Sequence, residues 1–160
     1  MNVRKLAALA GGAVVLAAGI AQAQIPQYGN NITLEQARKA AAAADAEARK
    51  NGWPMAIAIV DNAGQLVHFQ RADNTQTASI DISVDKAVSA AMLRRPTKVI
   101  QDAVAGGGAG VRFLGIRRAS PVEGGIPLTI DGKIVGGVGV SGMASDQDGM
   151  VAQAAVNALK

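Results

Sequence analysis

The chain has 160 residues, of which 49 % are hydrophobic and 18 % charged, and its formal net charge is +4. This length predicts a single domain, and the high apolar content excludes an intrinsically disordered chain. The absence of cysteine excludes disulfides, thiolate metal sites and cysteine nucleophiles. Because His68 is the only histidine, an ordinary four-ligand zinc site is not expected.

The first 23 residues have the organisation of a secretory signal peptide. The basic pair Arg4 and Lys5 precedes an apolar stretch from Leu6 to Ile20, and Ala21-Gln22-Ala23 matches the small-x-small cleavage pattern. The 15-residue stretch is short for a spanning helix, which needs about 20 residues, so we expect cleavage after Ala23 and no stable membrane anchor afterwards. The remaining 137 residues would be periplasmic or secreted, and their scattered net charge of +2 does not predict nucleic-acid binding.

The first half of the exported chain predicts a helix, a hairpin and two more helices. Thr33 and Gln36 have the spacing of a capping box, which predicts a helix from there to Lys50 that ends at Asn51-Gly52. The next elements are two strands around a turn-forming Asp-Asn-Ala-Gly sequence, a helix with apolar residues at helical spacing, and a short helix after a proline. Their predicted ranges are Met55–Val60, Gln65–Arg71, Thr77–Leu93 and Thr97–Val104.

The second half predicts a further hairpin and a last helix. The glycine-rich segment 105–110 is typical of a mobile loop, with a lid over a pocket as its functional alternative, and Val111–Ile116 is a candidate strand. Ile126–Ile130 and Lys133–Val140 flank Asp131-Gly132 as a hairpin, and we expect Ser145 to cap the final helix with Asp148 three residues later. These hairpins predict the α+β class, with an antiparallel sheet of about four to five strands and helices packed on it.

Two motifs resemble nucleotide or hydrolase signatures without completing them. Gly137–Gly142 matches G-x-G-x-x-G, but a dinucleotide site also needs a crossover to a parallel strand and an acid about 20 residues on, which the sequence does not supply. We therefore expect a strand whose glycines let a helix, a subunit or a flat ligand approach the backbone. A Ser-His-Asp triad is not expected, because Ser141 lies outside any G-x-S-x-G elbow.

The single histidine is the strongest candidate for a metal-ligating side chain. His68 is either a structural residue or an axial ligand to haem iron. The weaker iron-ligand candidates are Tyr28, Met55, Met92, Met143 and Met150, although methionine more commonly fills a core.

Two sets of charged residues are further candidates for binding. Asp81 and Asp85 lie one helical turn apart, either on a solvated face or as a cation site. The arginine pairs at 94–95 and 117–118 are surface residues or partners for carboxylates such as haem propionates.

Three stretches in series resemble the GlcG/HbpS family, which includes the C-terminal domain of PduO, and together they cover nearly all of Thr33–Lys160. The stretches are Ala58–Asp73; Ser79–Ser83 with Lys86-Ala87 and Arg95-Pro96-Thr97; and Gly124–Leu128, Asp131–Gly136 and Val138–Gly142, followed by Asp146 and Asp148. Family members often carry Arg-Met-Asp where this chain has Arg71-Ala72-Asp73, so no role of that methionine is transferred. The resemblance implies a single α+β domain, assembly into homo-oligomers, and haem binding.

The main hypothesis is therefore an exported haem-binding protein, with haem sensing, storage or degradation as its roles. The predicted cofactor-binding residues are His68, Arg71, Asp81, Lys86, Gly124, Gly125, Ser141 and Gly142, with His68 as the iron ligand. The alternative is an enzyme that acts on a small organic acid or related metabolite in the same pocket, with Arg71, Asp81, Lys86 and Ser141 as its working residues. A third hypothesis is a purely structural or assembly protein, which a filled interior without a pocket would favour.

Overall fold

The computed structural model describes residues 25–160, so the predicted signal peptide and its cleavage site lie outside the described residues. The chain forms four strands, four α-helices and one 3-10 helix in the described range. In chain order these are α1 (Leu34–Lys50), β1 (Ala56–Asp61), β2 (Leu66–Arg71), α2 (Ser79–Leu93), α3 (Thr97–Ala105), η1 (Gly108–Gly115), β3 (Gly125–Ile130), β4 (Lys133–Ser141) and α4 (Ser145–Asn157). None of the described helices is both long and apolar enough to cross a membrane.

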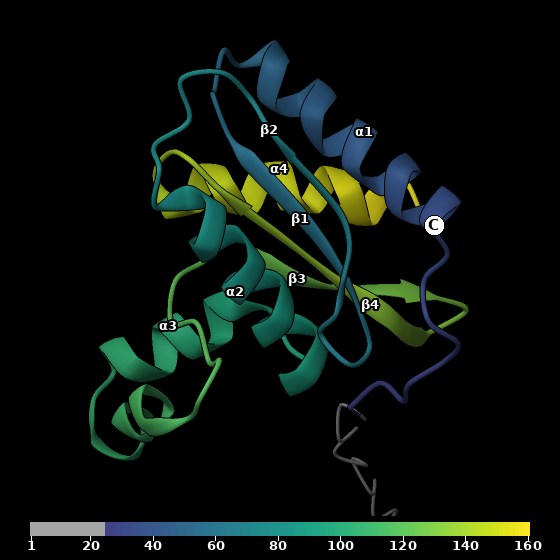
Figure 1. Cartoon of the computed structure of the whole chain (residues 1–160). Coiled ribbons are helices and arrows are strands. Elements are labelled where there is room, and N and C mark those ends of the chain that lie inside the picture. The colour runs from purple at the N-terminus through teal and green to yellow at the C-terminus, as the bar shows by residue number, and fades with distance from the viewer. Residues whose placement is uncertain (1–24) are drawn as a thin grey trace, which may run out of the picture.

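The strands form one antiparallel sheet in the order β2-β1-β4-β3, with helices on both faces. Helices α1 and α4 cover one face and α2 lies across the other, while α3 and η1 form a lobe beside α2 (Figure 1). Alternate residues of β1 separate two cores, because Ile57 and Ile59 pack under α1 and α4 whereas Ala58 and Val60 pack under α2. The α+β class and the antiparallel sheet are thus as predicted, with four strands.

The glycines of β4 allow α2 to lie directly on the sheet. Val138 and Val140 point into the core beneath α1 and α4, and Gly137 and Gly139 alternate with them on the α2 face. A Cβ atom at either glycine would come within 3.0 Å of the α2 backbone, closer than real Cβ contacts. The G-x-G-x-x-G spacing therefore serves helix packing, which is one of the three close approaches that the sequence predicted.

The start of α1 confirms the predicted capping box. The backbone N–H of Gln36 donates to the Thr33 hydroxyl oxygen at 3.2 Å, and the backbone N–H of Thr33 donates to the Gln36 side chain at 2.9 Å. Two of the four unpaired N–H groups at the helix start are thereby satisfied. Five buried alanines then give α1 the flat face that packs on the sheet side of the molecule.

The prediction for residues 105–116 was wrong in two respects. Ala105 ends α3, and the segment from Gly108 to Gly115 is a 3-10 helix rather than a loop followed by a strand. Positive φ angles at Gly107 and Gly108 reverse the chain, and Gly110 packs so tightly on the α3 backbone that no Cβ would fit there. The glycines thus fold η1 back onto α3. The apolar residues of η1 therefore lie away from the edges of the sheet and cannot pair as a strand.

The cap of α4 differs from the prediction by one residue. Ala144, not Ser145, is the N-cap, and its backbone N–H donates to the Gln147 side chain at 3.2 Å. Asp148 consequently lies in the second half of the first turn, with its side chain turned into the protein. The Asp148 carboxylate lies next to the end of β4, where it accepts from the Met143 N–H.

Candidate functional site

A buried ion pair between Lys86 of α2 and Asp148 of α4 joins the two faces of the sheet. The Lys86 Nζ lies 2.6 Å from the Asp148 Oδ2, and the two side chains are only 1 % and 3 % exposed. Lys86 also donates to the Val140 carbonyl oxygen at 3.0 Å, and the other carboxylate oxygen of Asp148 accepts from the Met143 N–H at 3.1 Å. The pair therefore fixes the chain where β4 ends and α4 begins.

Burial opposes the charged form of both members of this pair. Desolvation lowers the pKa of Lys86 from its ordinary 10.5, against the opposing effect of Asp148. Desolvation likewise raises the pKa of Asp148 from its ordinary 3.8, although Lys86 and the backbone N–H groups of Met143 and Gly142 oppose it. Groups shifted in this way, beside a cavity, are typical of functional sites.

Two glycines before and within β3 make room for the ion pair. A Cβ atom at Gly124 would lie 2.8 Å from both the Lys86 Nζ and the Asp148 Cβ, and the φ angle of Gly124 is +123°. A Cβ atom at Gly125 would meet the Lys86 backbone, and the Gly125 N–H donates to the Thr97 hydroxyl at 2.9 Å. Both glycines also line a small second cavity of about 210 Å³. They are required for packing around the pair.

The ion pair borders an open cavity of about 440 Å³, which we call the main cavity. Its volume lies within the range of about 300–1,000 Å³ that is usual for small-molecule sites. The walls come from the first half of α2, the segment before β3, the end of β4 and the first turn of α4. The lining residues are Gln76, Ile82, Asp85, Lys86, Arg118, Ala119, Ser120, Pro121, Val122, Ser141, Met143, Ser145 and Asp148.

The walls of the main cavity combine apolar surface with a few polar groups. Ile82, Pro121 and Val122 supply apolar contacts, and Arg118 is an exposed cation at the rim. Ser141 is buried at the end of β4, where its hydroxyl lies 3.1 Å from the hydroxyl of Ser79 in a hydrogen bond. Such a mixture suits a largely apolar ligand that carries a few polar or anionic substituents.

Five of the eight predicted site residues gather around the ion pair. Lys86 and Ser141 line the main cavity, while Gly124 and Gly125 pack against Lys86. Gly142 follows Ser141, and its N–H stabilises the charged form of Asp148. Because Lys86 is already paired within the protein, its main role at the cavity is to fix the positions of Asp148 and the end of β4.

The remaining three predicted residues lie outside the main cavity. His68 is paired with Ile59, so its side chain lies on the sheet face that α1 and α4 cover, opposite to α2. Arg71 is exposed on β2. It and Ser141 both pair with Ala56 of β1, so two strand spacings, about 10 Å, separate the backbones of Arg71 and Ser141. Asp81 is exposed in the first turn of α2. The role of His68 as iron ligand stays a prediction, and it requires a haem position outside this cavity.

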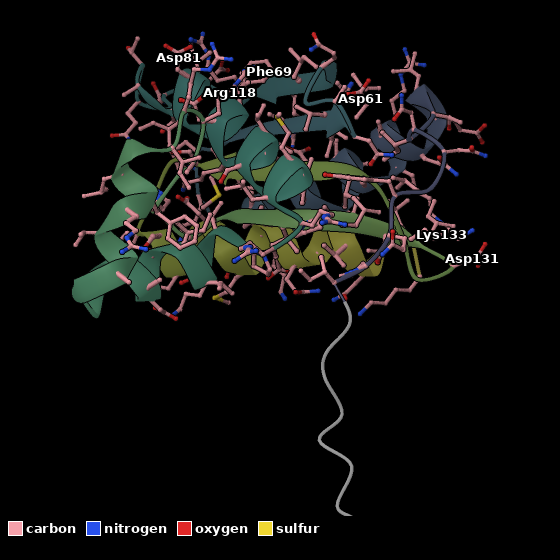
Figure 2. The ribbon with its side chains drawn as sticks, turned by 90° about the horizontal axis from the view of Figure 1, so that it is seen from below. Asp61, Phe69, Asp81, Arg118, Asp131 and Lys133 are labelled. Atoms are coloured by element: carbon pink, nitrogen blue, oxygen red, sulfur yellow. The ribbon has the colours of Figure 1, made fainter. Side chains whose placement is uncertain are left out.

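This arrangement does not assemble the four residues of the organic-acid enzyme. Lys86 and Ser141 share the main cavity, but Arg71 and Asp81 do not line it. The third hypothesis, a purely structural protein, predicted a filled interior without a pocket, and the main cavity does not agree with that prediction. In Figure 2, Arg118 and Asp81 lie at one end of the molecule, and Asp131 and Lys133 of the β3–β4 turn lie at the opposite end.

Asp148, the partner of Lys86, was not predicted from the sequence. A signal was available in α2, because Lys86 follows Ser83 at helical spacing on the face that also buries Ala87 and Ala90. A lysine in that position requires a buried acceptor. Nothing in the sequence identified which acid supplies it. Among the described residues, no group of three or more acidic or histidine side chains is arranged to hold a metal ion.

A further cavity of about 590 Å³ lies away from this site. It runs between the segment before α1 and the β3–β4 turn, lined mainly by polar residues such as Asn30, Asn31 and Thr33. Its charged lining residues, Asp131 and Lys133, are both exposed. We therefore take the main cavity, with its buried ion pair, as the candidate site.

Comparison with known proteins gives concordant sequence and structure matches. A sequence profile described as "Haem degrading protein HbpS-like" matches residues 32–157. Protein GlcG of Escherichia coli strain K12 is 39 % identical over 100 residues, which cover 62 % of this chain and 73 % of GlcG.

Two solved structures have the same fold. A crystal structure of a double mutant of Streptomyces reticuli HbpS is 31 % identical with a TM-score of 0.76, and the match covers 94 % of this chain and 99 % of that one. A crystal structure of a PduOC–haem complex is 26 % identical with a TM-score of 0.74, covering 81 % and 96 % of the two chains. Both matches thus extend over most of this chain and nearly all of the compared chain.

Proposed function

Because the chain belongs to the HbpS-like family of haem-degrading proteins, we propose that it is an exported haem-binding protein whose haem site is the main cavity. The observation that carries the placement is the cavity beside the Lys86–Asp148 pair, with apolar walls and a cationic rim. The structure of a PduOC–haem complex, which has the same fold, supports haem as the ligand. The predicted signal peptide supports export to the periplasm or beyond the cell.

The wall residues fit the chemical requirements of haem. The porphyrin ring needs apolar surface, which Ile82, Pro121 and Val122 provide. Its propionates need a cation, and Arg118 can pair with a carboxylate at the rim of the cavity. Bound haem would supply the iron chemistry, while the protein supplies binding and orientation. We propose assembly into homo-oligomers as a further property of the exported protein, and haem sensing, storage or degradation as its roles.

A haemin titration with a pair of matched variants tests this proposal. The chain from Gln24 contains every described residue of the fold and is the form to purify. Val122 lines the cavity and is 40 % exposed, whereas Val99 of α3 is 48 % exposed and does not line it. Val122→Trp should obstruct the cavity, and Val99→Trp adds the same side chain elsewhere.

We expect the unaltered chain and Val99→Trp to give the same saturable change in Soret absorbance. Val122→Trp should weaken haemin binding at least tenfold, about 1.4 kcal/mol, because the indole occupies space that the ring requires. A featureless, non-saturating titration of the unaltered chain would contradict haem binding. Equal affinities for the two tryptophan variants would contradict the placement of haem in the main cavity.

A further inference from the structure

We propose that Met143 is the protein ligand to the haem iron, an inference that rests on the proposed haem site in the main cavity. Protein ligands to haem iron are histidine, cysteine, methionine or tyrosine side chains. The chain contains no cysteine. The described side chains of these types are His68, Tyr28, Met55, Met92, Met143 and Met150, and the structure places them in very different surroundings.

Neither the histidine nor the tyrosine reaches the main cavity. His68 lies on the sheet face that α1 and α4 cover, as its pairing with Ile59 shows. The Tyr28 hydroxyl donates to the carbonyl oxygens of Ala91 and Met92, at 3.0 and 3.1 Å, near the C-terminal end of α2. The cavity borders the opposite half of that helix, so both side chains are separated from it.

Three of the four described methionines are also outside the cavity. Met55 is a fully buried core residue at the start of β1. The sulfur of Met92 lies at the end of α2 beside Gly64, where a Cβ atom on that glycine would be 3.2 Å away. Met150 is 54 % exposed on α4 but does not line the cavity. Their positions account for them as core filler or surface residues.

Met143 alone among these candidates lines the main cavity. The residue is 41 % exposed, and its thioether, a weak acceptor, does not require a hydrogen-bond partner within the protein. Its backbone N–H, in contrast, is held at 3.1 Å by Asp148, which Lys86 holds in turn at 2.6 Å. The main chain is thus positioned by the Lys86–Asp148 pair, while the exposed side chain lines the cavity. This preorganisation lowers the entropy cost of ligation.

The other polar residues of the cavity do not offer an equivalent electron-pair donor to the haem iron. Asp85 contributes a carboxylate and Ser141 a hydroxyl that is already hydrogen-bonded to Ser79, and neither group is a usual protein ligand of haem iron. The Arg118 guanidinium carries no lone pair for a metal and suits the propionates instead. The chemistry of the walls therefore assigns the soft sulfur to the iron and the cation to the carboxylates.

Three variants of the chain from Gln24 test this assignment through absorption spectra of the haemin complex. Met143→Leu removes the sulfur with little change in volume. Met150→Leu makes the same change at an exposed position outside the cavity, and His68→Ala removes the only imidazole. Circular dichroism of the apo forms verifies that each variant is folded, which the exposure of Met143 leads us to expect.

We expect Met143→Leu to shift the Soret maximum, to abolish the sulfur-to-iron charge-transfer band of the ferric complex, and to lower its reduction potential, since methionine ligation raises that potential. Met150→Leu and His68→Ala should retain the unaltered spectrum. A saturable complex whose spectrum survives Met143→Leu would overturn the ligand assignment while leaving the proposed function standing. Loss of the spectrum in His68→Ala would assign the ligand to His68 instead. Absence of saturable binding by the unaltered chain would overturn the proposed function itself.

Discussion

The substitution Lys86→Met should be among the most destabilising single changes at the site, because it leaves a buried carboxylate without its cation. Methionine retains most of the unbranched side chain that fills the space under Gly124, so little packing is lost. Asp148, which is 3 % exposed, loses the ammonium group 2.6 Å away and keeps only its backbone N–H donors. The variant therefore isolates the electrostatic contribution of the pair.

The expected loss follows from the burial of both partners. Removal of one partner of a buried ion pair typically costs about 3–5 kcal/mol, because the other charge remains desolvated. For a domain of this size each kcal/mol lowers the melting temperature by roughly 3–4 °C, so we expect a decrease of about 10–20 °C. The variant should nevertheless fold, since the two apolar cores do not depend on Lys86.

The loss should also depend on pH. Burial raises the pKa of Asp148 above its ordinary 3.8 in the folded protein, and Lys86 opposes this rise. Without Lys86 the folded pKa rises further while the unfolded pKa stays ordinary. Below the pKa that Asp148 has in the unfolded chain, the carboxyl group is protonated in both states and destabilises the folded state least. As the pH rises through the higher pKa of the folded state, the buried group becomes charged and stability is lost. The difference between the variant and the unaltered chain should therefore be small near pH 4 and largest at neutral pH.

Thermal or urea unfolding at several pH values measures this difference, and the exposed pair on α3 supplies the control. Lys98 Nζ also lies 2.6 Å from a carboxylate oxygen, that of Asp102, but both side chains are about half exposed. Lys98→Met should leave stability almost unchanged, because water and salt screen an exposed pair. Equal losses for Lys86→Met and Lys98→Met, or a Lys86→Met loss that is the same at all pH values, would refute the reasoning.

Three further predictions concern the packing and hydrogen bonds that hold the elements together. Gly139→Ala should destabilise the fold by ~1–3 kcal/mol because its Cβ would meet the α2 backbone, whereas Gly115→Ala, with open space around it, should change stability by less than ~0.5 kcal/mol in chemical denaturation. Thr33→Ala removes half of the capping box and should lower the free energy of unfolding by ~1 kcal/mol in the same assay. An unchanged stability would contradict a stabilising role of the Thr33 cap. Tyr28→Phe should cost ~1 kcal/mol through loss of the hydroxyl donor, and a melting temperature equal to that of the unaltered chain would show that water replaces it.

The elements that depend on local sequence were predictable, and the structure confirms them. The Thr33–Gln36 capping box, the two hairpins and the apolar periodicity of α2 all act within a few residues of the chain. Alternating valines and glycines in β4 even indicated that something approaches one face of that strand closely. Short-range turn chemistry and side-chain period were sufficient for these features.

The site depends on contacts that no local pattern contains. Lys86 and Asp148 are 62 residues apart, and they meet because a sheet lies between their helices with β4 in its centre. The 3-10 helix was missed for the same reason, since Gly110 has no visible purpose until α3 lies against it. The prediction of His68 as a ligand depends on its being the only histidine, and that count does not show which face of β2 carries its side chain.

The glycines and the buried lysine are parts of one arrangement. Lys86 lies one residue before Ala87, the residue of α2 that packs against Gly137 and Gly139, so its distance from the sheet is set by those glycines. At that distance the ammonium group reaches the Val140 carbonyl across the strand and, past the end of β4, Asp148. A side chain at Gly139 would lift α2 and lengthen both contacts. Gly139→Ala should therefore weaken haemin binding as well as the fold, whereas Thr33→Ala, which acts on α1 at the far side of the sheet, should weaken the fold alone.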